Sequence, residues 1–390
     1  MTILEEYLSK GWTHVQLEEE LNRLINEYSK VRECNLLVYA ATPQAPVPDV
    51  ALSQKDFYFI KDLLDGCAKK KKKLDIYLET PGGSGEAAEE IVKYIRKKYK
   101  DISFVICGEA KSAGTILAMS GDEILMTDTG SLGPIDAQMV IGRSQVSAYD
   151  YTDWVEEKRK EAESKPLNQV DIAILAQISP GELKGAINAQ EYAVEMVREW
   201  LANYKFKNWT KTATRGIPVT KKMREERASE IARDLNNHNK WKTHGRSLKK
   251  EDLESIKLNI TDIEKDDTLK DLVYRIHTIC RLLYMSGNTY KIIATENNKL
   301  VFTFNATPPV NNQIAPPEVV EIDTECPNCK KVHNLYIKLK DDKTLDEKAA
   351  AKGRIKFPEN NILTCECGFE LNLIGIRNDI EAQTKIKTID

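Results

Sequence analysis

The sequence predicts an α/β fold with a mainly parallel central sheet, and two observations support this prediction. Four short apolar runs suit buried strands, and the first three are each followed by a segment with helical character. Strands that alternate with helices in this way form βαβ crossovers, so neighbouring strands are expected to run parallel. The runs are NLLVYA (36–41), LDIYLE (74–79), SFVICGEA (103–110) and DEILMT (122–127).

The helical segments follow the strands in order. After the first strand, Phe57, Ile60 and Leu64 recur at helical spacing. After the second strand, TPGGSG opens an amphipathic helix that is expected to extend through Tyr99. A short helix rich in small residues (112–120) follows the third strand. In sheets of this kind, catalytic and binding groups gather where strands end and helices begin.

The composition is that of a globular protein with one large domain and one or two smaller ones. Of the 390 residues, 41% are hydrophobic and 30% are charged, and the formal net charge is only −3. This balance gives no general case for binding to nucleic acid or to a membrane. The start, MTILEEYLSKGW, lacks the pattern of an export signal, and no run has the length of a membrane span. The expected location is the cytoplasm.

Two turns between strand and helix are candidates for a catalytic site. Thr80–Ser84 (TPGGS) has two adjacent glycines that let backbone amides approach a ligand closely. Lys111–Thr115 (KSAGT) places Ser112 at the start of a helix, where free amides and the helix dipole favour an oxyanion. Taken singly, a tight turn and a helix N-cap are the simpler interpretations. Together, in adjacent βα units, the turns can supply a nucleophile and amide donors on one sheet edge.

The strings ETPGGSGEAAEEI and GEAKSAGTILAMSGDEILMTDTGSLGPID resemble the Clp-protease/crotonase superfamily of serine peptidases, over roughly residues 35–140. Within it, the sequence is most similar to the serine dehydrogenase proteinase family, with signal peptide peptidase A as a nearby relative. The resemblance implies a ClpP/crotonase-like βαβ core that hydrolyses peptide bonds through an acyl-enzyme on Ser112. It also implies that the amides of Gly83 and Ala113 hold the oxyanion.

The base that activates Ser112 stays open between two residues. Clp-type peptidases use a histidine further along the chain, but the corresponding stretch, GSLGPIDAQM, contains only Asp136, a weak candidate without a histidine. Relatives of signal peptide peptidase use a lysine, and Lys184 in PGELKGA has apolar neighbours that can desolvate it. His244 lies in a string, WKTHGR, that resembles an element of the serine dehydrogenase proteinase group, and histidine is the usual base at neutral pH.

Beyond the resemblance, the chain is mostly helical by pattern from about residue 150 to residue 285. Apolar spacing predicts helices over 192–204, 223–237 and 269–285. In related folds such helices shape the substrate cleft and mediate assembly, so the resemblance implies a homo-oligomer. The predicted parts are an N-terminal helical segment (1–34), a catalytic domain (35–215), a helical extension with short strands (216–304), a Pro-rich linker (305–319) and a zinc ribbon (320–380).

The zinc ribbon is predicted from two close pairs of cysteines near the C-terminus. Cys326 and Cys329 form a C-x2-C knuckle, and Cys365 and Cys367 form a C-x-C knuckle. Four thiolates at such spacing complete a tetrahedral shell, so the expected ion is a structural Zn²⁺. His333 lies nearby but is not needed as a ligand. The flanking segments VHNLYIKL and FELNLIGI alternate like short strands.

Three hypotheses for function follow. The first is a serine peptidase acting on a peptide or protein substrate through Ser112. The second is a crotonase-like acyl-CoA enzyme that uses the same oxyanion site without the serine. The third is a non-catalytic scaffold that binds a protein or nucleic acid through the zinc ribbon.

Overall fold

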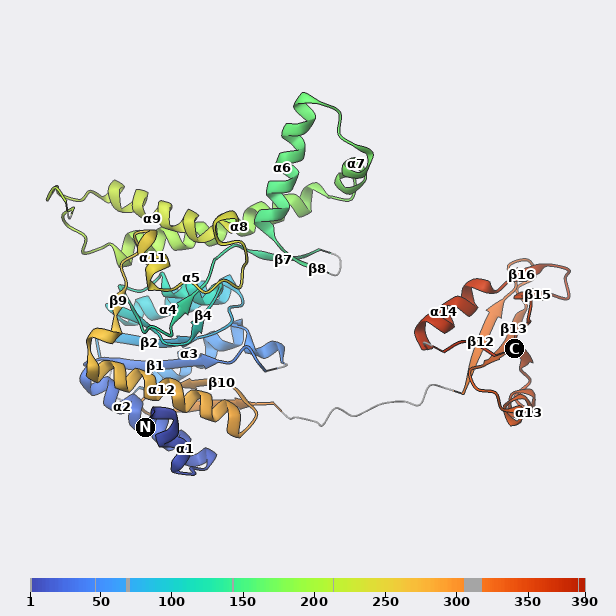
Figure 1. Cartoon of the computed structure of the whole chain (residues 1–390), viewed down its shortest axis with the longest axis horizontal. Coiled ribbons are helices and arrows are strands. Elements are labelled where there is room, and N and C mark those ends of the chain that lie inside the picture. The colour runs from blue at the N-terminus through green and yellow to red at the C-terminus, as the bar shows by residue number, and fades with distance from the viewer. Residues whose placement is uncertain are drawn as a thin grey trace. The chain divides into compact units, whose positions relative to one another are not determined.

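The computed structural model of the protein divides into two compact units, Met1–Asn305 and Ala306–Asp390, and each is described by itself (Figure 1). Most of the predicted linker, residues 305–319, lies outside the described residues. The structure describes residues 2–45, 47–67, 71–141, 144–212, 214–304, 318–384 and 386–389.

The first unit is built on a sheet whose described strands have the order β11-β10-β1-β2-β3-β5-β9 (Figure 1). Strands β1, β2, β3, β5 and β9 run parallel, whereas β10 pairs antiparallel with β1 and β11 pairs antiparallel with β10. The predicted α/β fold with a mainly parallel sheet is therefore confirmed. The strands are β1 (Asn35–Ala41), β2 (Lys73–Glu79), β3 (Asp101–Ile106), β5 (Glu123–Met126), β9 (Thr261–Asp262), β10 (Thr289–Ala294) and β11 (Lys299–Thr303).

Helices cover both faces of this sheet, because strand side chains alternate between two apolar layers. In β1, Leu37 and Tyr39 belong to one buried cluster, and Leu36 and Val38 belong to the other. The first layer is completed by α3 (Gln54–Asp65), α4 (Gly85–Lys98), α5 (Ala113–Ala118), α8 (Pro180–Trp200) and α9 (Lys221–Asn236). The second layer is completed by α1 (Ile3–Ser9), α2 (His14–Val31) and α12 (Asp267–Ser286).

Helix α4 shows how the local sequence forms these elements. The Ser84 side chain caps the helix by accepting the Ala87 N–H, and Arg96, Lys97 and Lys98 complement the dipole in the last turn. The buried face of α4 packs toward the sheet. Because α4 begins shortly after β2 ends, this packing fixes the turn between the two elements. The helix ends at Lys98, one residue before the predicted limit at Tyr99.

The predicted strand 103–110 is two strands. β3 ends at Ile106, and β4 (Glu109–Ala110) leaves the main sheet to pair with β6 (Ser131–Leu132). The break lies at Gly108, which packs against the Glu79 side chain so closely that a Cβ would come within 2.7 Å of Oε2. Thr80, directly after β2, still bridges to Ala110 in β4, with its N–H donating to the Glu109 carbonyl at 2.7 Å, and β4 leads directly into the Lys111–Thr115 turn.

The predicted helices of the middle region are present. Segment 192–204 lies in α8 and a π-helical turn (Leu201–Lys205), segment 223–237 in α9, and segment 269–285 in α12. Of the helices that the structure describes, none combines the length and the apolarity that crossing a membrane requires. Further elements near the site are β7 (Gln138–Ile141), β8 (Ser144–Ser147), α6 (Ala148–Ser164), α7 (Gln169–Leu175), α10 (His238–Trp241) and α11 (Lys250–Ser255).

The second unit has a small sheet, β12-β13-β14, and a separate hairpin of β15 and β16. Leu335, Ile337 and Phe357 belong to its buried cluster together with Cys326 and Cys365. Its elements are β12 (Val319–Glu325), β13 (Val332–Lys338), α13 (Lys343–Ala351), β14 (Ile355–Lys356), β15 (Ile362–Thr364), β16 (Glu370–Asn372) and α14 (Ile374–Thr384).

One expectation for this unit is wrong. The segment FELNLIGI forms a strand only over Glu370–Asn372, because α14 begins at Ile374. The Asn372 side chain accepts the Ile374 N–H at 3.0 Å, which satisfies a free amide at the helix start. The segment VHNLYIKL forms β13 as expected.

Candidate active site and metal centre

The two turns predicted from the sequence are in direct contact. A Cβ placed on Gly82 would lie 2.7 Å from the Cβ of Ser112 and 2.9 Å from the carbonyl oxygen of Lys111. Gly82 also has a φ of +106°, which side chains rarely adopt. Only glycine therefore lets the turn after β2 approach Ser112 this closely.

The backbone of Ser112 is strained and its side chain does not cap α5. Its φ of 50° and ψ of −116° lie outside the regions that a serine ordinarily occupies. Such residues cost about 1–3 kcal/mol and are concentrated at functional sites. Ser112 stands at the N-cap position, but its side chain accepts no N–H of the helix. The interpretation of Ser112 as a simple cap is therefore not supported.

Two backbone amides beside Ser112 are available to a ligand. In the described part of the chain, the N–H groups of Gly83 and Ala113 donate to no acceptor. Leu52 holds the backbone on both sides of Gly83. Its N–H donates to the Gly82 carbonyl at 2.7 Å, and its carbonyl accepts the Ser84 N–H at 2.9 Å. Unpaired amides fixed next to a nucleophile are the donors that an oxyanion hole requires.

Asp136 binds the imidazole of His244. The side chain of Asp136 is fully buried, at 0% exposure, and its Oδ1 lies 2.8 Å from His244 Nδ1. Because a carboxylate only accepts, Nδ1 carries the proton and Nε2 is left as the nitrogen that can accept one. His244 Nε2 has no hydrogen-bond partner among the described residues. This is the arrangement of a general base held by an acid.

The electrostatic balance at Asp136 favours its charged form. Burial by itself raises the pKa of the Asp136 carboxyl, but hydrogen bonds from His244, His238 and Ser147 outweigh that effect. The net result is a lowered pKa. Asp136 is therefore a carboxylate that can stabilise a positive charge on His244.

Ser112, Asp136 and His244 line one cavity of about 520 Å³. Gly83 and Ala113, the residues of the two free amides, line the same cavity. The cavity opens at the ends of β2 and β4, the sheet edge to which the sequence assigned the site. A serine, a histidine, a carboxylate and two residues with free amides thus line one cavity.

Lys184, the other predicted base, lies outside this cavity. It is exposed on the first turns of α8, and it is not among the residues that line the space around Ser112. Of the two predicted bases, the structure brings only His244 to the cavity of Ser112.

Lys111 anchors the loop that carries His244. Its buried Nζ donates to the Ser247 Oγ at 2.8 Å, to the Leu132 carbonyl at 3.1 Å and to the Arg246 carbonyl at 3.4 Å. Desolvation lowers the pKa of the Lys111 ammonium. Because Lys111 precedes Ser112 directly, these bonds tie the loop of His244 to the turn of Ser112.

Sequence reasoning missed three residues of this site: Asp136 as the partner of a histidine, His238, and Lys111. Asp136 looked isolated because no histidine follows it closely in sequence. Asp136 and His238 meet only in the folded chain. The Ile135 N–H donates to the Leu235 carbonyl at 3.1 Å, which places the Asp136 loop beside the end of α9.

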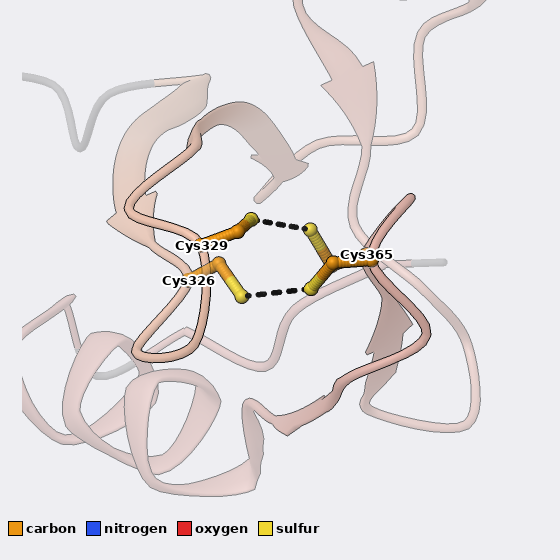
Figure 2. Close-up of side chains that lie close together, drawn as sticks. Cys326, Cys329 and Cys365 are labelled. Carbon is orange, nitrogen blue, oxygen red and sulfur yellow. Dashed lines mark hydrogen bonds between the residues drawn. The ribbon is translucent and has the colours of Figure 1, made fainter.

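The four cysteines of the second unit lie together. Their sulfur atoms are all within 4.8 Å of one another. Cys326 and Cys367 are separated by 3.7 Å between Sγ atoms, and Cys329 and Cys365 by 3.5 Å. In Figure 2, Cys326 and Cys329 come from one loop and face Cys365 on another. A tetrahedral site with metal–sulfur bonds of about 2.3 Å requires sulfur separations of about 3.8 Å, so the donor set fits a metal ion.

Backbone turns present the thiols of both knuckles. The Lys330 N–H donates to the Cys326 carbonyl at 2.9 Å, and the Gly368 N–H donates to the Cys365 carbonyl at 2.9 Å. Lys330 and Gly368 both have positive φ, which closes each turn tightly. His333 is buried, with Nε2 at 3.2 Å from Cys365 Sγ, so it contacts the four-sulfur set from outside.

Comparison with curated proteins gives two similar chains from Methanocaldococcus jannaschii. The protein named Uncharacterized protein MJ0137 is 29% identical over 175 residues, which cover 43% of this chain and 55% of that protein. The protein named Uncharacterized protein MJ1495 is 25% identical over 143 residues, which cover 37% of this chain and 44% of that protein. The chain thus spans about half the length of the curated relatives it matches.

Two solved structures are also similar in part. They are an alanine mutant of 1510-N membrane-bound stomatin-specific protease, and a second alanine mutant of it in complex with a substrate peptide. Both are 13% identical with a TM-score of 0.34, and the matches cover 57% and 65% of this chain and 79% and 83% of those chains.

A family model described as ClpP-like SDH-type serine proteinase matches residues 66–220. This segment contains β2, β3, β5, Ser112 and Asp136, whereas His244 lies beyond it. The resemblance seen in the sequence is therefore confirmed over residues 66–220, which match the model of the ClpP-like SDH-type serine proteinase family.

Proposed function

We propose that this protein is a serine peptidase in which Ser112 is the nucleophile, His244 is the base and Asp136 holds that base. The observation that carries the proposal is the placement of Ser112, Asp136 and His244 around one cavity, with Asp136 bonded to His244 Nδ1 at 2.8 Å. The strained serine and the match of residues 66–220 to a serine proteinase family support it.

The proposed reaction proceeds in two halves. Ser112 Oγ attacks the peptide carbonyl as its proton passes to His244 Nε2, and the N–H groups of Gly83 and Ala113 bind the oxyanion. When the tetrahedral intermediate collapses, the C–N bond breaks and His244 gives its proton to the leaving amine. Water then attacks the acyl-enzyme as His244 accepts a proton from it; the bond between the acyl carbon and Ser112 Oγ breaks, His244 returns the proton to Oγ, and the carboxylic acid is released. Asp136 stays charged throughout and stabilises the protonated imidazole.

A second cavity beside the first gives room for a substrate side chain. It has a volume of about 730 Å³ and shares His244 and Gln138 with the cavity of Ser112. Trp154 and Ile174 are among its apolar residues. This supports a peptide or unfolded protein segment with an apolar residue near the cleaved bond as the substrate.

Hydrolysis of a fluorogenic peptide library by four proteins tests the proposal. The unmodified chain is expected to cleave peptides, and Ser112→Ala and His244→Ala are expected to lose about a thousand-fold or more in kcat. Lys184→Ala is the matched control and keeps its activity within about two-fold, because Lys184 is exposed away from the cavity. Loss of activity in Lys184→Ala with retention in His244→Ala would assign the base to the lysine and overturn the proposal.

We infer that the cysteine cluster holds a structural Zn²⁺. Four thiolates leave no open position for water or substrate, so the ion would hold Cys326, Cys329, Cys365 and Cys367 together without taking part in hydrolysis. Metal analysis of the purified protein by mass spectrometry is expected to give one zinc per chain. Binding of a protein or nucleic acid through this unit, and assembly into a homo-oligomer, stay predictions.

The acyl-CoA and scaffold hypotheses differ from the proposal in a measurable way. An acyl-CoA enzyme of the crotonase type needs the amides of Gly83 and Ala113 but not the hydroxyl of Ser112. A scaffold needs neither. Turnover of acyl-CoA esters by Ser112→Ala would favour the former, and biological activity that survives Ser112→Ala but not removal of residues 306–390 would favour the latter.

A further inference from the structure

A second histidine contacts the same carboxylate as the proposed base. His238 Nδ1 lies 2.9 Å from Asp136 Oδ2, while His244 Nδ1 lies 2.8 Å from Asp136 Oδ1. Each oxygen of Asp136 thus faces one imidazole. Since Asp136 only accepts, the Nδ1 of each ring is the donor.

The chain between the two histidines is folded to allow this double contact. His238 begins the short helix α10, and Lys242 closes that helix in the left-handed conformation with a φ of 68°. Trp241 fixes the helix, because it is buried and its Nε1–H donates to the Asp234 carbonyl at 2.6 Å. The reversal at Lys242 brings His244 back toward the carboxylate that His238 already binds.

His238 also connects Asp136 to helix α6. His238 Nε2 lies 3.3 Å from Asp150 Oδ2, in the first turn of that helix. The ring is mostly buried, with 15% of its side chain exposed, so it is held between two carboxylates on different elements. A ring packed between two elements in this way restricts where Asp136, the acceptor of its Nδ1–H, can lie.

The other donors to Asp136 belong to a different element. Gln138 Nε2 and Ser147 Oγ each lie 2.9 Å from Asp136 Oδ2. These two residues are directly opposite each other in the β7–β8 hairpin, so they move together. His238 is the donor that ties the carboxylate to the segment carrying His244.

We propose that His238 is a positioning residue whose Nδ1–H holds the Asp136 carboxylate in the orientation that lets it bind and orient His244. This rests on the proposed function for its catalytic consequence, but the orientation of His244 can be measured without catalysis. His238 lines the neighbouring cavity rather than the cavity of Ser112, so it acts through Asp136.

Two substitutions of similar size separate the contacts of His238. In His238→Asn the side-chain N–H₂ can take the place of Nδ1 and donate to Asp136, but it cannot reach Asp150. In His238→Gln the longer amide takes the place of Nε2 and faces Asp150, and the donor to Asp136 is lost. If orientation of Asp136 is the role of His238, Asn retains function and Gln does not.

The kinetic expectation is a loss in kcat with little change in KM. His238→Gln and His238→Ala are expected to lower kcat about ten- to a hundred-fold, the usual effect of a misplaced catalytic group, with KM within about two-fold. His238→Asn is expected to keep kcat within about three-fold. Asp153→Asn is the control from the same helix, because Asp153 contacts Asn239 and makes no recorded contact with His238.

The deciding measurement is the proton NMR signal of the His244 Nδ1–H in the full chain, assigned by its loss in His244→Ala. A strong bond to a buried carboxylate protects this proton from exchange and moves its signal downfield. The signal is expected in the unmodified protein, His238→Asn and Asp153→Asn, and to be broadened or absent in His238→Gln and His238→Ala.

Each outcome decides the proposal. A signal that persists unchanged in His238→Gln and His238→Ala, or that is absent from the unmodified protein, overturns it. If no variant cleaves peptides but the signal follows the expected pattern, the peptidase proposal fails while the positioning role stands. If the unmodified protein cleaves peptides and all four His238 and Asp153 variants match it in kcat, the peptidase proposal stands and the positioning role fails.

Discussion

The two units of the chain place their chemistry on their folds in opposite ways. In residues 1–305, the buried apolar clusters on the two faces of the sheet contain neither Ser112 nor His244. Both residues lie outside this core. In residues 306–390, two of the four clustered cysteines, Cys326 and Cys365, are themselves members of the small buried cluster. The first unit can therefore lose its site and keep its fold, whereas the second has its fold built around its site.

Removing the metal is expected to have the largest effect, confined to the second unit. Zinc binding to small modules of this kind contributes about 10–16 kcal/mol, so a chelator or Cys326→Ser should unfold residues 318–384. Amides of the seven-stranded sheet in the same sample are the internal control. Hydrogen exchange by mass spectrometry measures both. Unchanged protection of the second unit after metal removal would show that its apolar cluster suffices.

Breaking a buried ion pair is expected to have the next largest effect, confined to the first unit. Lys291 Nζ lies 2.9 Å from Asp56 Oδ1, and both side chains are almost fully buried. Lys291→Met leaves Asp56 buried without its partner and should lower the free energy of unfolding by about 3–5 kcal/mol. Lys299→Met, which removes a partly exposed pair with Glu18, should cost about 0–1 kcal/mol. Urea unfolding compares the two, and equal losses would contradict the explanation.

Substitution of Gly82 tests how strongly a small change beside Ser112 affects stability and activity. Gly82→Ala must place a methyl group against Ser112 at a φ of +106°, so it should cost about 1–3 kcal/mol and at least a hundred-fold in kcat. Gly185→Ala in α8 is the control, because a Cβ there meets nothing within 4 Å. That change should leave activity intact and add up to about 1 kcal/mol of stability. Full activity of Gly82→Ala would remove the argument for close contact between the two turns.

Acid is expected to have the smallest effect of the four. The pKa of Asp136 is lowered in the folded protein, so its contribution to stability is present above its unfolded pKa of about 3.9 and is lost as the pH falls through the lower folded value. Urea midpoints between pH 3 and pH 6 should therefore fall less steeply toward acid in Asp136→Asn than in the unmodified protein. Identical slopes would show that Asp136 titrates alike in both states.

The parts of the site that the sequence predicts are those that are local in the chain. Gly83, Ser112 and Ala113 follow directly from strand-to-helix turns in adjacent βα units, and the structure brings those turns into contact. The parallel sheet follows from the alternation of apolar runs and amphipathic segments. The spacing of the cysteine pairs likewise predicts a shared metal site, and their sulfur atoms lie together.

The parts that the sequence leaves open depend on contacts between distant segments. Whether His244 or Lys184 lines the cavity of Ser112 depends on how the loop after α10 folds back, and Lys111 bonds to that loop at Arg246 and Ser247. Asp136 has no histidine close to it in the sequence. In the structure, His238 and His244, which follow α9, both contact its carboxylate. At the break of the predicted strand 103–110, Gly108 packs against the side chain of Glu79 from a neighbouring strand, a contact that the sequence does not reveal.

The central claim is that Ser112 is a nucleophile activated by His244, and covalent labelling tests it most directly. The full chain is treated with a fluorophosphonate, and the modified residue and its rate of modification are measured by peptide mass spectrometry. We expect one adduct on the peptide containing Ser112, formed about a thousand-fold more slowly in His244→Ala and at an unchanged rate in Lys184→Ala. A folded protein in which Ser112 stays unmodified, or is modified equally fast without His244, would contradict the account.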